Sequence, residues 1–303
     1  MKCLIVGCGH VGLPLGAELV RRGHEVFGLR RTGADELNSV GIQPLIADIT
    51  QSKTPAKLPH DFDWVVNCVA SGGGNADDYR STYLEGNRNL IAWLADSPLQ
   101  KFVYTSSTSV YGQNDGAVVT EDSPAEPTEE TAKVLVETER LLLGGHGSRG
   151  RSPHQEFPAV VLRVAGIYGP ERGHGFKQFL RGEARIEDGG SRWLNMIHRD
   201  DVVACIIGAL ERARPGEIYN AVDDEPVTQL KFFEWLATEL KRPLPPKCAP
   251  GAEGRRKRGT TNKRVSNAKL RRALEYEFQF PTFREGYAGE IARLKRAGKM
   301  PHL

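Results

Sequence analysis

The chain has 303 residues, and its 41 basic and 38 acidic side chains leave a formal charge of only +3. An apolar share of 39% can build a core, which excludes a disordered chain, and no apolar run approaches the ~20 residues that cross a bilayer. The first residues lack a signal-peptide pattern, so we expect a cytoplasmic protein. The five scattered cysteines form no Cys-x-x-Cys pair, which predicts reduced thiols and no metal site.

The first thirty residues predict a phosphate-binding loop between a strand and a helix. Residues 2–6 are apolar and rich in β-formers, and apolar side chains then recur at helical spacing up to Gly23. Between them lies the motif G-x-G-x-x-G. Its glycines permit a tight turn, close approach of a diphosphate and close helix packing, and the helix N-terminus attracts the phosphates. We assign to this loop Gly7, Gly9, His10, Val11 and Gly12.

The end of the second predicted strand, residues 24–29, indicates which dinucleotide is bound. An acid about 20 residues beyond the glycines binds the ribose hydroxyl of NAD, whereas arginine there accommodates the 2′-phosphate of NADP. Arg30 and Arg31 occupy this place, and no acid appears before Asp35. The sequence therefore favours NADP over NAD, unless both arginines are merely solvated.

Further β-like runs at residues 44–47, 64–70, 102–106, 160–165 and 218–222 alternate with helical patterns at 83–95 and 131–143. This alternation predicts an α/β fold with a doubly wound, mostly parallel Rossmann sheet. We expect residues 1–170 to form the dinucleotide-binding domain, with residues 196–223 returning to it. Residues 171–303, including a helix at 226–242, form the substrate-facing region.

A basic run covers residues 255–272, which hold nine Lys or Arg and no acid. Such a run can bind nucleic acid, but it contains no aromatic residues for stacking and the rest of the chain is acidic. We therefore expect a solvated loop or a site for an anionic substrate, and no nucleic-acid partner. Arg172, Lys177, Arg181 and Arg185 would also suit an anionic ligand.

Four motifs occur in order: the glycine loop, SSTSVYG at 106–112, RVAGIYGP at 163–170 and IHRDD at 197–201. With them the chain resembles the short-chain dehydrogenase/reductase superfamily, and within it the extended and atypical NAD-dependent epimerase/dehydratase branch. The resemblance implies that Asp48 faces the adenine and that Ala70 and Ser71 line the cofactor pocket. It also implies that Asn87 is the family's helix asparagine.

The chemistry implied by this resemblance is hydride transfer assisted by Ser or Thr, Tyr and Lys. Ser107 matches the first of these and Lys133 the last. The family tyrosine is missing, because Glu129 stands four residues before Lys133 where the pattern has Tyr-x-x-x-Lys. Tyr111, Tyr168 or Glu129 could carry the proton instead, or the substrate itself could, or the protein binds the dinucleotide without turning it over. Lys133 could equally be an ordinary ion-pair residue on the helix surface.

His198 and Asp201 could be taken for an acid/base pair, but we expect Asp200 or Asp201 to cap the helix that follows. Taken together, the sequence predicts an NAD(P)-dependent oxidoreductase or epimerase acting on a small carbonyl or hydroxyl compound, with nucleotide sugars as one class. The alternative is a catalytically impaired NADP-binding sensor or regulatory protein. A homodimer is left open.

Overall fold

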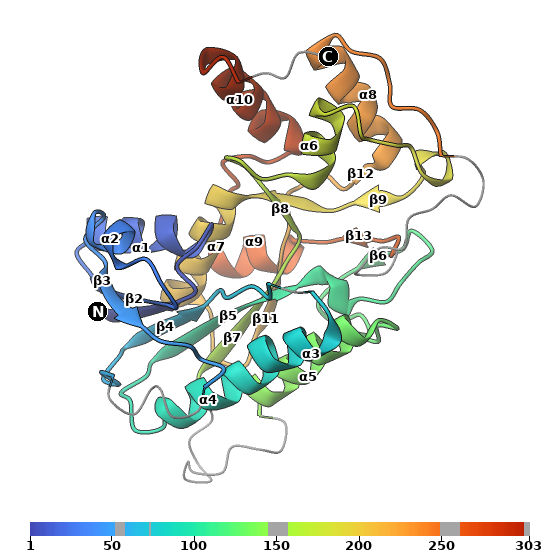
Figure 1. Ribbon diagram of the computed structural model, residues 1–303. Helices are drawn as coiled ribbons and strands as arrows, with labels where there is room; N and C mark the ends of the chain where they lie inside the picture. The colour runs from blue at the N-terminus through green and yellow to red at the C-terminus, as the bar shows by residue number, and fades with distance from the viewer. Residues whose placement is uncertain (52–57, 73, 145–156, 249–260, 300–303) are drawn as a thin grey trace.

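The structure is a computed structural model that describes residues 1–51, 58–72, 74–144, 157–248 and 261–299 (Figure 1). Its main sheet, within these ranges, has seven strands in the order β11-β7-β5-β4-β1-β2-β3. All neighbouring strands in it pair in parallel. The strands are β1 (Lys2–Val6), β2 (Glu25–Arg30), β3 (Gln43–Ile46), β4 (Trp64–Asn67), β5 (Lys101–Ser107), β7 (Ala159–Val164) and β11 (Ile218–Ala221).

These strands confirm the predicted doubly wound sheet, and their ends lie within three residues of the predicted ones. Every residue of β7 is buried, as expected for a parallel strand that is covered on both faces. The chain runs outward from β1 to β3, then crosses to β4 on the other side of β1 and continues to β11. The strand order therefore reverses between β1 and β4, the place where doubly wound folds bind ligands.

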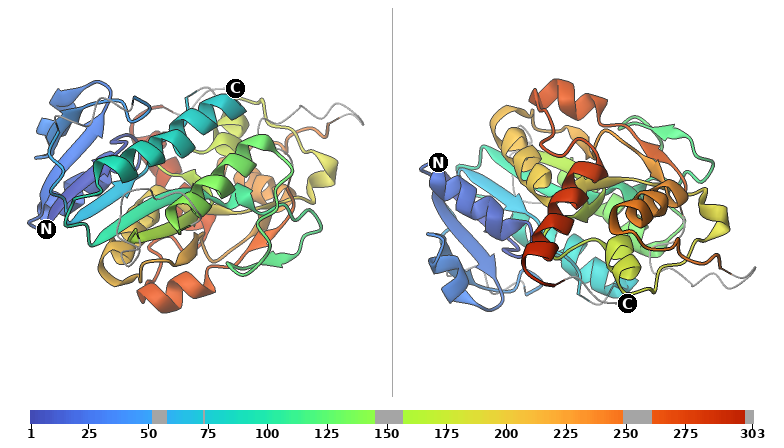
Figure 2. Two further views of the ribbon diagram at one scale, coloured as in Figure 1. Left: turned by 90° about the horizontal axis from the view of Figure 1, so that it is seen from below. Right: turned by 90° about the horizontal axis from the view of Figure 1, so that it is seen from above.

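Helices cover both faces of the sheet (Figure 2). One layer contains α1 (Gly12–Arg21), α7 (Arg199–Arg212) and α9 (Ala268–Leu274), with α2 (Ala34–Asn38) beside β3. The other contains α3 (Ala76–Tyr79), α4 (Gly86–Trp93) and α5 (Glu130–Leu142). Between α3 and α4 runs a π-helical turn, Arg80–Glu85, which overlaps the start of the helix predicted at residues 83–95. Such turns are frequent at functional sites.

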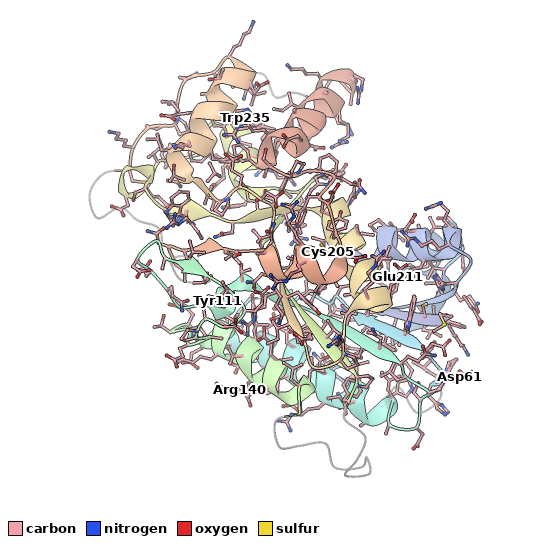
Figure 3. The ribbon with its side chains drawn as sticks, turned by 180° about the vertical axis from the view of Figure 1, so that it is seen from behind. Asp61, Tyr111, Arg140, Cys205, Glu211 and Trp235 are labelled. Atoms are coloured by element: carbon pink, nitrogen blue, oxygen red, sulfur yellow. The ribbon has the colours of Figure 1, made fainter. Side chains whose placement is uncertain are left out.

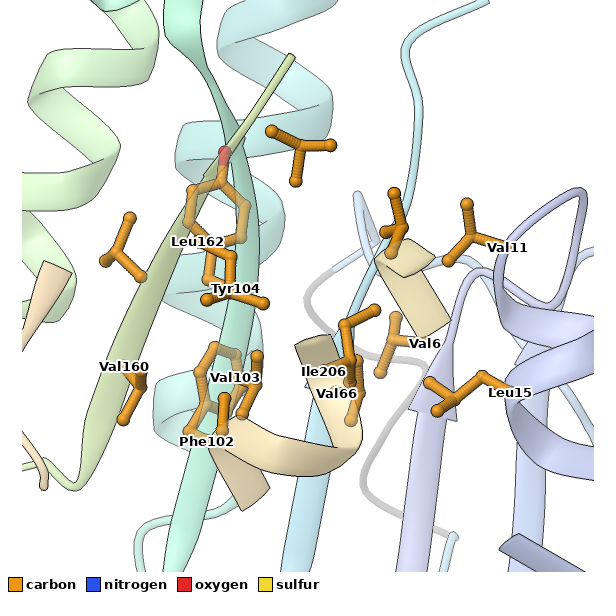
Figure 4. Close-up of a cluster of buried hydrophobic side chains, with 14 of the residues drawn as sticks. Val6, Val11, Leu15, Val66, Phe102, Val103, Tyr104, Val160, Leu162 and Ile206 are labelled. Atoms are coloured by element: carbon orange, nitrogen blue, oxygen red, sulfur yellow. The ribbon is translucent and has the colours of Figure 1, made fainter. Parts of the chain in front are cut away.

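The larger core lies between the sheet and these two layers. Figure 4 shows Ile206 of α7 beside Val66 of β4, with Phe102 and Val103 of β5 and Leu15 of α1 in the same cluster. All five side chains are buried. Burial of apolar surface on this scale is the main stabilising contribution to such a domain.

A second, smaller core lies beyond the carboxyl ends of the strands. It is formed by α6 (His174–Leu180), α8 (Gln229–Leu240) and α10 (Phe283–Arg296), the group at the top of Figure 1. Two short pairs of strands flank it: β8 (Gly166–Tyr168) with β10 (Met196–His198), and β9 (Trp193–Leu194) with β12 (Val227–Thr228). A third pair, β6 (Val118–Val119) with β13 (Arg264–Val265), contributes to the larger core. Trp235, labelled in Figure 3, belongs to this upper cluster.

The chain passes between the two cores more than once. After residue 170 it returns to the main core through α7 and β11, and again through α9 and Phe278. The second return was not predicted. It follows from the apolar side chains Leu270 and Leu274, which are fully buried with the larger cluster.

Candidate functional site

A cavity of about 1070 Å³ opens at the carboxyl ends of the main-sheet strands. Segments that follow β1, β2, β3, β4, β5 and β7 line it, together with residues of α6, β9 and the chain around Thr261. Of the residues assigned to a site from the sequence, the following line the cavity: Gly7, Gly9, His10, Val11, Arg30, Arg31, Asp48, Ala70 and Ser107. Gly12, Ser71, Asn87, Tyr111, Glu129 and Lys133 are not among the lining residues.

The three motif glycines occupy different environments. Gly7 has a φ of +92°, which disfavours any side chain, and a Cβ there would lie 2.7 Å from the Val69 nitrogen. A Cβ on Gly12 would lie 2.4 Å from the Gly7 carbonyl oxygen, so this glycine lets helix α1 pack closely against the loop. A Cβ on Gly9 would meet nothing within 4 Å. Gly9 therefore leaves free space at the loop for a ligand.

The surroundings of this loop fit the diphosphate of a nicotinamide dinucleotide. Helix α1 begins at the cavity wall, because Gly9, His10 and Val11 line the cavity and Val11 gives the helix no side-chain cap. The positive end of the helix dipole therefore lies at the loop. The Nε2 atom of His10 is buried and has no hydrogen-bond partner among the described residues. Burial, and then Arg172 and Arg199, lower the pKa of His10 to about 4, which keeps its ring neutral at neutral pH. A neutral ring can donate one hydrogen bond to a phosphate oxygen.

The two arginines predicted to select the cofactor lie at the other end of this loop. The Nη1 atom of Arg30 donates to the Cys8 carbonyl at 3.3 Å and pairs with Glu36 at 2.7 Å. Arg30 is therefore held against the glycine loop, while Arg31 is exposed beside it. Beside them, just after the neighbouring strand β3, Asp48 accepts hydrogen bonds from the backbone N–H and hydroxyl of Thr50. The site has both cationic and acidic groups where the ribose and base would lie.

Of the three residues predicted after β4, Ala70 lines the cavity, whereas Ser71 and Asn87 form hydrogen bonds behind its wall. The Ser71 N–H donates to the Tyr83 hydroxyl and its hydroxyl donates to Asp78. The Asn87 amide is fully buried behind the wall, where it bonds Asn67 and the Tyr83 carbonyl. The structure thus gives Ser71 and Asn87 contacts that hold the wall in place.

Helix α5 differs from what the family pattern implies. Lys133 is half exposed and pairs with Glu130 at 2.7 Å, and Glu129 is an exposed residue at the start of the helix. The residue of α5 that lines the cavity is Leu135. It lies two positions beyond Lys133, on the opposite side of the helix. The ordinary ion-pair interpretation of Lys133 matches this placement, and the ribose contact implied by the resemblance does not.

Ser107 and Tyr111 begin and end one short turn after β5. The Ser107 hydroxyl lines the cavity and accepts a hydrogen bond from the Ser109 N–H at 3.2 Å. The fully buried Tyr111 hydroxyl instead donates to Asn220 at 2.8 Å and accepts from Arg163 at 2.9 Å. Burial raises the pKa of Tyr111, which makes it a weaker proton donor. These contacts place its hydroxyl in the protein interior, away from a substrate.

Tyr168 and the IHRDD segment close the upper wall of the cavity. The Tyr168 ring lines the cavity and stacks on Tyr287 with centroids 4.4 Å apart, and its hydroxyl donates to the Thr282 carbonyl. The expected cap at Asp200 or Asp201 is wrong, because the His198 side chain accepts the Asp200 N–H at helix α7. Asp201 instead accepts from the Tyr276 hydroxyl and two backbone N–H groups. His198 and Asp201 therefore hold the fold together and do not form an acid/base pair.

The basic run contains a functional candidate that sequence reasoning missed. Its residues 255–260 lie outside the described residues, but Lys263 lines the cavity and is 3% exposed. Two later cations pair with acids, Lys269 with Glu217 at 2.6 Å and Arg271 with Asp224 at 3.2 Å. Of the four cations predicted to suit an anionic ligand, Arg172 lines the cavity. No local signal in the sequence separates Lys263 from its neighbours.

A family model described as the NAD-dependent epimerase/dehydratase family matches residues 3–221. The chain belongs to this family. Among its relatives, Protein YeeZ of Escherichia coli K12 is 28% identical over 287 residues, which cover 92% of this chain and 96% of YeeZ. A 3-diazoavenalumate denitrifying reductase of Streptomyces is 25% identical and covers 96% of this chain and all of its own length.

Solved structures agree with this assignment. A candidate NAD-dependent epimerase/dehydratase of Methylobacillus flagellatus is 33% identical, with a TM-score of 0.76 and coverage of 97% of this chain and 98% of that one. UDP-glucuronic acid 4-epimerase of Bacillus cereus, solved with UDP-glucuronic acid and NAD, is 22% identical with a TM-score of 0.80. The match spans 98% of this chain and 100% of the epimerase chain. At 22% identity, this likeness shows that the two proteins share a fold.

The described residues contain neither a metal-binding cluster nor a membrane-spanning helix. Within those residues, no cluster of three or more His, Cys, Asp or Glu side chains is arranged to hold a metal ion. Within the same ranges, the helices are all too short or too polar to cross a bilayer.

Proposed function

We propose that the protein is an NADP-preferring oxidoreductase or epimerase that acts on a small carbonyl or hydroxyl compound. The observation that carries this proposal is one continuous cavity lined by the glycine loop, by Arg30 and Arg31, and by Ser107. When bound, the dinucleotide supplies or accepts a hydride. The Ser107 hydroxyl holds the substrate oxygen by hydrogen bonding. We keep the cytoplasm as the expected location.

The substrate belongs beside Ser107, toward the upper part of the cavity. The wall there is lined by polar groups that can bind an anionic or hydroxylated compound: Arg172, Gln178, Arg192, Asn195, Gln229 and Lys263. A total volume of about 1070 Å³ accommodates more than one drug-sized molecule. A relative named 2-alkyl-3-oxoalkanoate reductase supports a carbonyl-type substrate, and nucleotide sugars are the anionic class to test beside it.

A specific observation favours a second candidate, a dinucleotide-binding sensor without turnover. Helix α5 presents Leu135 to the cavity, and Lys133 faces solvent. Titration of the intrinsic fluorescence with NADPH and NADH should show binding for both candidates. Turnover across a panel of small carbonyl compounds and nucleotide sugars should occur only with the enzyme. Absence of any dinucleotide affinity would refute both.

The choice of NADP has its own test. Replacing Arg30 by Asp and Arg31 by Ala removes the donors for a 2′-phosphate, and charge-assisted hydrogen bonds contribute about 1.5–3 kcal/mol each. We expect NADPH affinity to fall about 10- to 100-fold while NADH affinity holds or rises. The matched control is Glu36→Gln, which removes the partner of Arg30 and keeps the guanidinium. An unchanged NADPH/NADH ratio in the double variant would refute the NADP assignment.

A further inference from the structure

Lys263 is the buried cation of the substrate end of the cavity. Its Nζ atom donates to the Tyr111 carbonyl at 2.7 Å and to the Thr261 hydroxyl at 2.8 Å. A lysine ammonium has three N–H donors, so these two bonds leave one donor for another acceptor. Lys263 and Thr261 both line the cavity. The remaining donor is therefore available to a molecule bound there.

The position of this ammonium is fixed relative to Ser107. Tyr111, whose carbonyl it binds, ends the turn that the Ser107 side chain begins, and the Tyr111 N–H donates to the Thr108 carbonyl at 3.3 Å. Ser107 and Lys263 thus contact the two ends of one turn and line one cavity. Lys263 therefore lines the cavity next to the turn that Ser107 begins.

The backbone that carries Lys263 is held on both sides. The Asn195 side chain donates to the Lys263 carbonyl at 2.9 Å and accepts from the Val265 N–H at 2.8 Å. Arg264 and Val265 form strand β13, which pairs with β6. A group that moves a proton must be placed within a few tenths of an ångström, and this framework supplies that rigidity.

In the part of the chain that the structure describes, no carboxylate pairs with Lys263. Burial alone lowers its pKa to about 8. The charged or titratable groups on the elements around it point to other partners. Arg264 donates to the Gly116 carbonyl and lies over the Trp193 ring, Glu121 accepts from the Asn220 N–H, and Tyr111 directs its hydroxyl to Asn220. Arg192 also lines this part of the cavity.

We propose that Lys263 donates the proton to the substrate oxygen, the role that the resemblance gives to the missing tyrosine. The inference rests on the proposed function. In the reducing direction, the carbonyl carbon gains a hydride supplied by reduced nicotinamide, the C=O π bond breaks, and the oxygen takes a proton from the Lys263 ammonium. Lys263 becomes a neutral amine and regains a proton from water. In the oxidising direction, the neutral amine accepts the proton from the hydroxyl.

The test compares Lys263→Met and Lys263→Arg with a matched lysine outside the cavity. Lys101 is half-buried and, like Lys263, donates to a backbone carbonyl, that of Ala213, and burial lowers its pKa as well. General acid catalysis contributes about 10²- to 10⁴-fold, so Lys263→Met should lower kcat by that factor and leave NADPH affinity within about twofold. The Lys101→Met variant should keep kcat within about threefold of the wild-type value, because Lys101 does not line the cavity and cannot act as a general acid there.

The pH profile separates proton transfer from a merely structural role. In the wild-type protein kcat for reduction should fall above about pH 8, because the ammonium is then lost. Lys263→Arg should abolish this fall, since arginine stays protonated. A readout independent of turnover is the NMR titration of lysine Cε signals in the NADP-bound protein. The signal missing from Lys263→Met should titrate near pH 8, whereas titration near pH 10.5 would overturn the proposal.

The remaining outcomes are equally decisive. If Lys263→Met keeps kcat within threefold of wild type, or if Lys263→Arg retains the wild-type pH profile, the proposal fails. It also fails if the wild-type protein binds NADPH but turns over no carbonyl compound, and that result supports the sensor instead. Failure of NADPH binding refutes the proposed function itself, so the two failures are distinguished.

Discussion

Breaking the buried ion pair between β7 and α5 should be one of the most destabilising single changes in this protein. Arg163 and Glu139 are 4% and 3% exposed, and three hydrogen bonds join them, the shortest 2.8 Å long. Glu139 also accepts the Ser106 hydroxyl at 2.6 Å, and Arg163 donates to Tyr111. Arg163→Met leaves the Glu139 carboxylate buried with only a hydroxyl partner. Removal of one partner of such a pair costs about 3–5 kcal/mol.

That cost is a large share of the roughly 5–15 kcal/mol that stabilises a typical domain. Replacing both residues, with Arg163→Met and Glu139→Leu, removes both charges and restores an apolar contact. We expect the double variant to be more stable than either single variant, because no charge is left unpaired. Urea unfolding followed by circular dichroism gives each free energy, and equal m-values show that the transitions are comparable.

A surface ion pair provides the control. Lys133→Met breaks the pair with Glu130 and should cost less than about 1 kcal/mol. The reasoning is refuted if Arg163→Met costs no more than Lys133→Met, or if the two buried substitutions are simply additive. Additivity would mean that the two side chains do not interact.

Three further changes test the site and the pH dependence of stability. The Gly9→Ala variant should fold normally but lose dinucleotide affinity, because the new Cβ enters the open space that the ligand would occupy. The Gly12→Ala variant should have a lower Tm, because its Cβ would lie 2.4 Å from the Gly7 carbonyl oxygen. Calorimetry measures the Tm of each variant, and fluorescence titration measures its dinucleotide affinity. Burial raises the pKa of Asp223, so its contribution to stability is present below the unfolded value near pH 4 and lost as pH rises. Asp223→Asn should therefore raise the Tm at pH 7 and give no gain near pH 3. Burial raises the pKa of Cys3 to about 12, so stability should be lost from about pH 9 upward, and Cys3→Ala should reduce that loss in urea unfolding. An identical alkaline slope in wild type and variant would contradict this.

The sheet and the glycine loop could be predicted because their signals are local. The apolar run of β1, the glycines and the helix period of α1 all lie within twenty residues, and the structure reproduces them. The same holds for β4 and β5, whose apolar character follows from burial on both faces.

Helix α5 shows where local reasoning failed. Its existence and ends were predicted, but the side facing the cavity was not, because the tyrosine that would set the register of the family pattern is missing. Each helical residue turns about 100°, so an error of two positions exchanges the buried and exposed sides. The sequence left open whether Lys133 contacts the ribose or pairs on the helix surface; in the structure it pairs with Glu130, and Leu135 lines the cavity. Lys263 was missed for another reason, because its burial depends on contacts with residues about 150 positions earlier in the chain.

The repeated return of the chain to the larger core makes the upper group of helices inseparable from the sheet. A chain cut after residue 170 would lack β11, and β7, buried along its whole length, would become a bare sheet edge. Exposed edges of this kind pair with other chains and aggregate. The nucleotide-binding half is thus not a portable module, and new specificities in this architecture have to arise by changing side chains and loops in place.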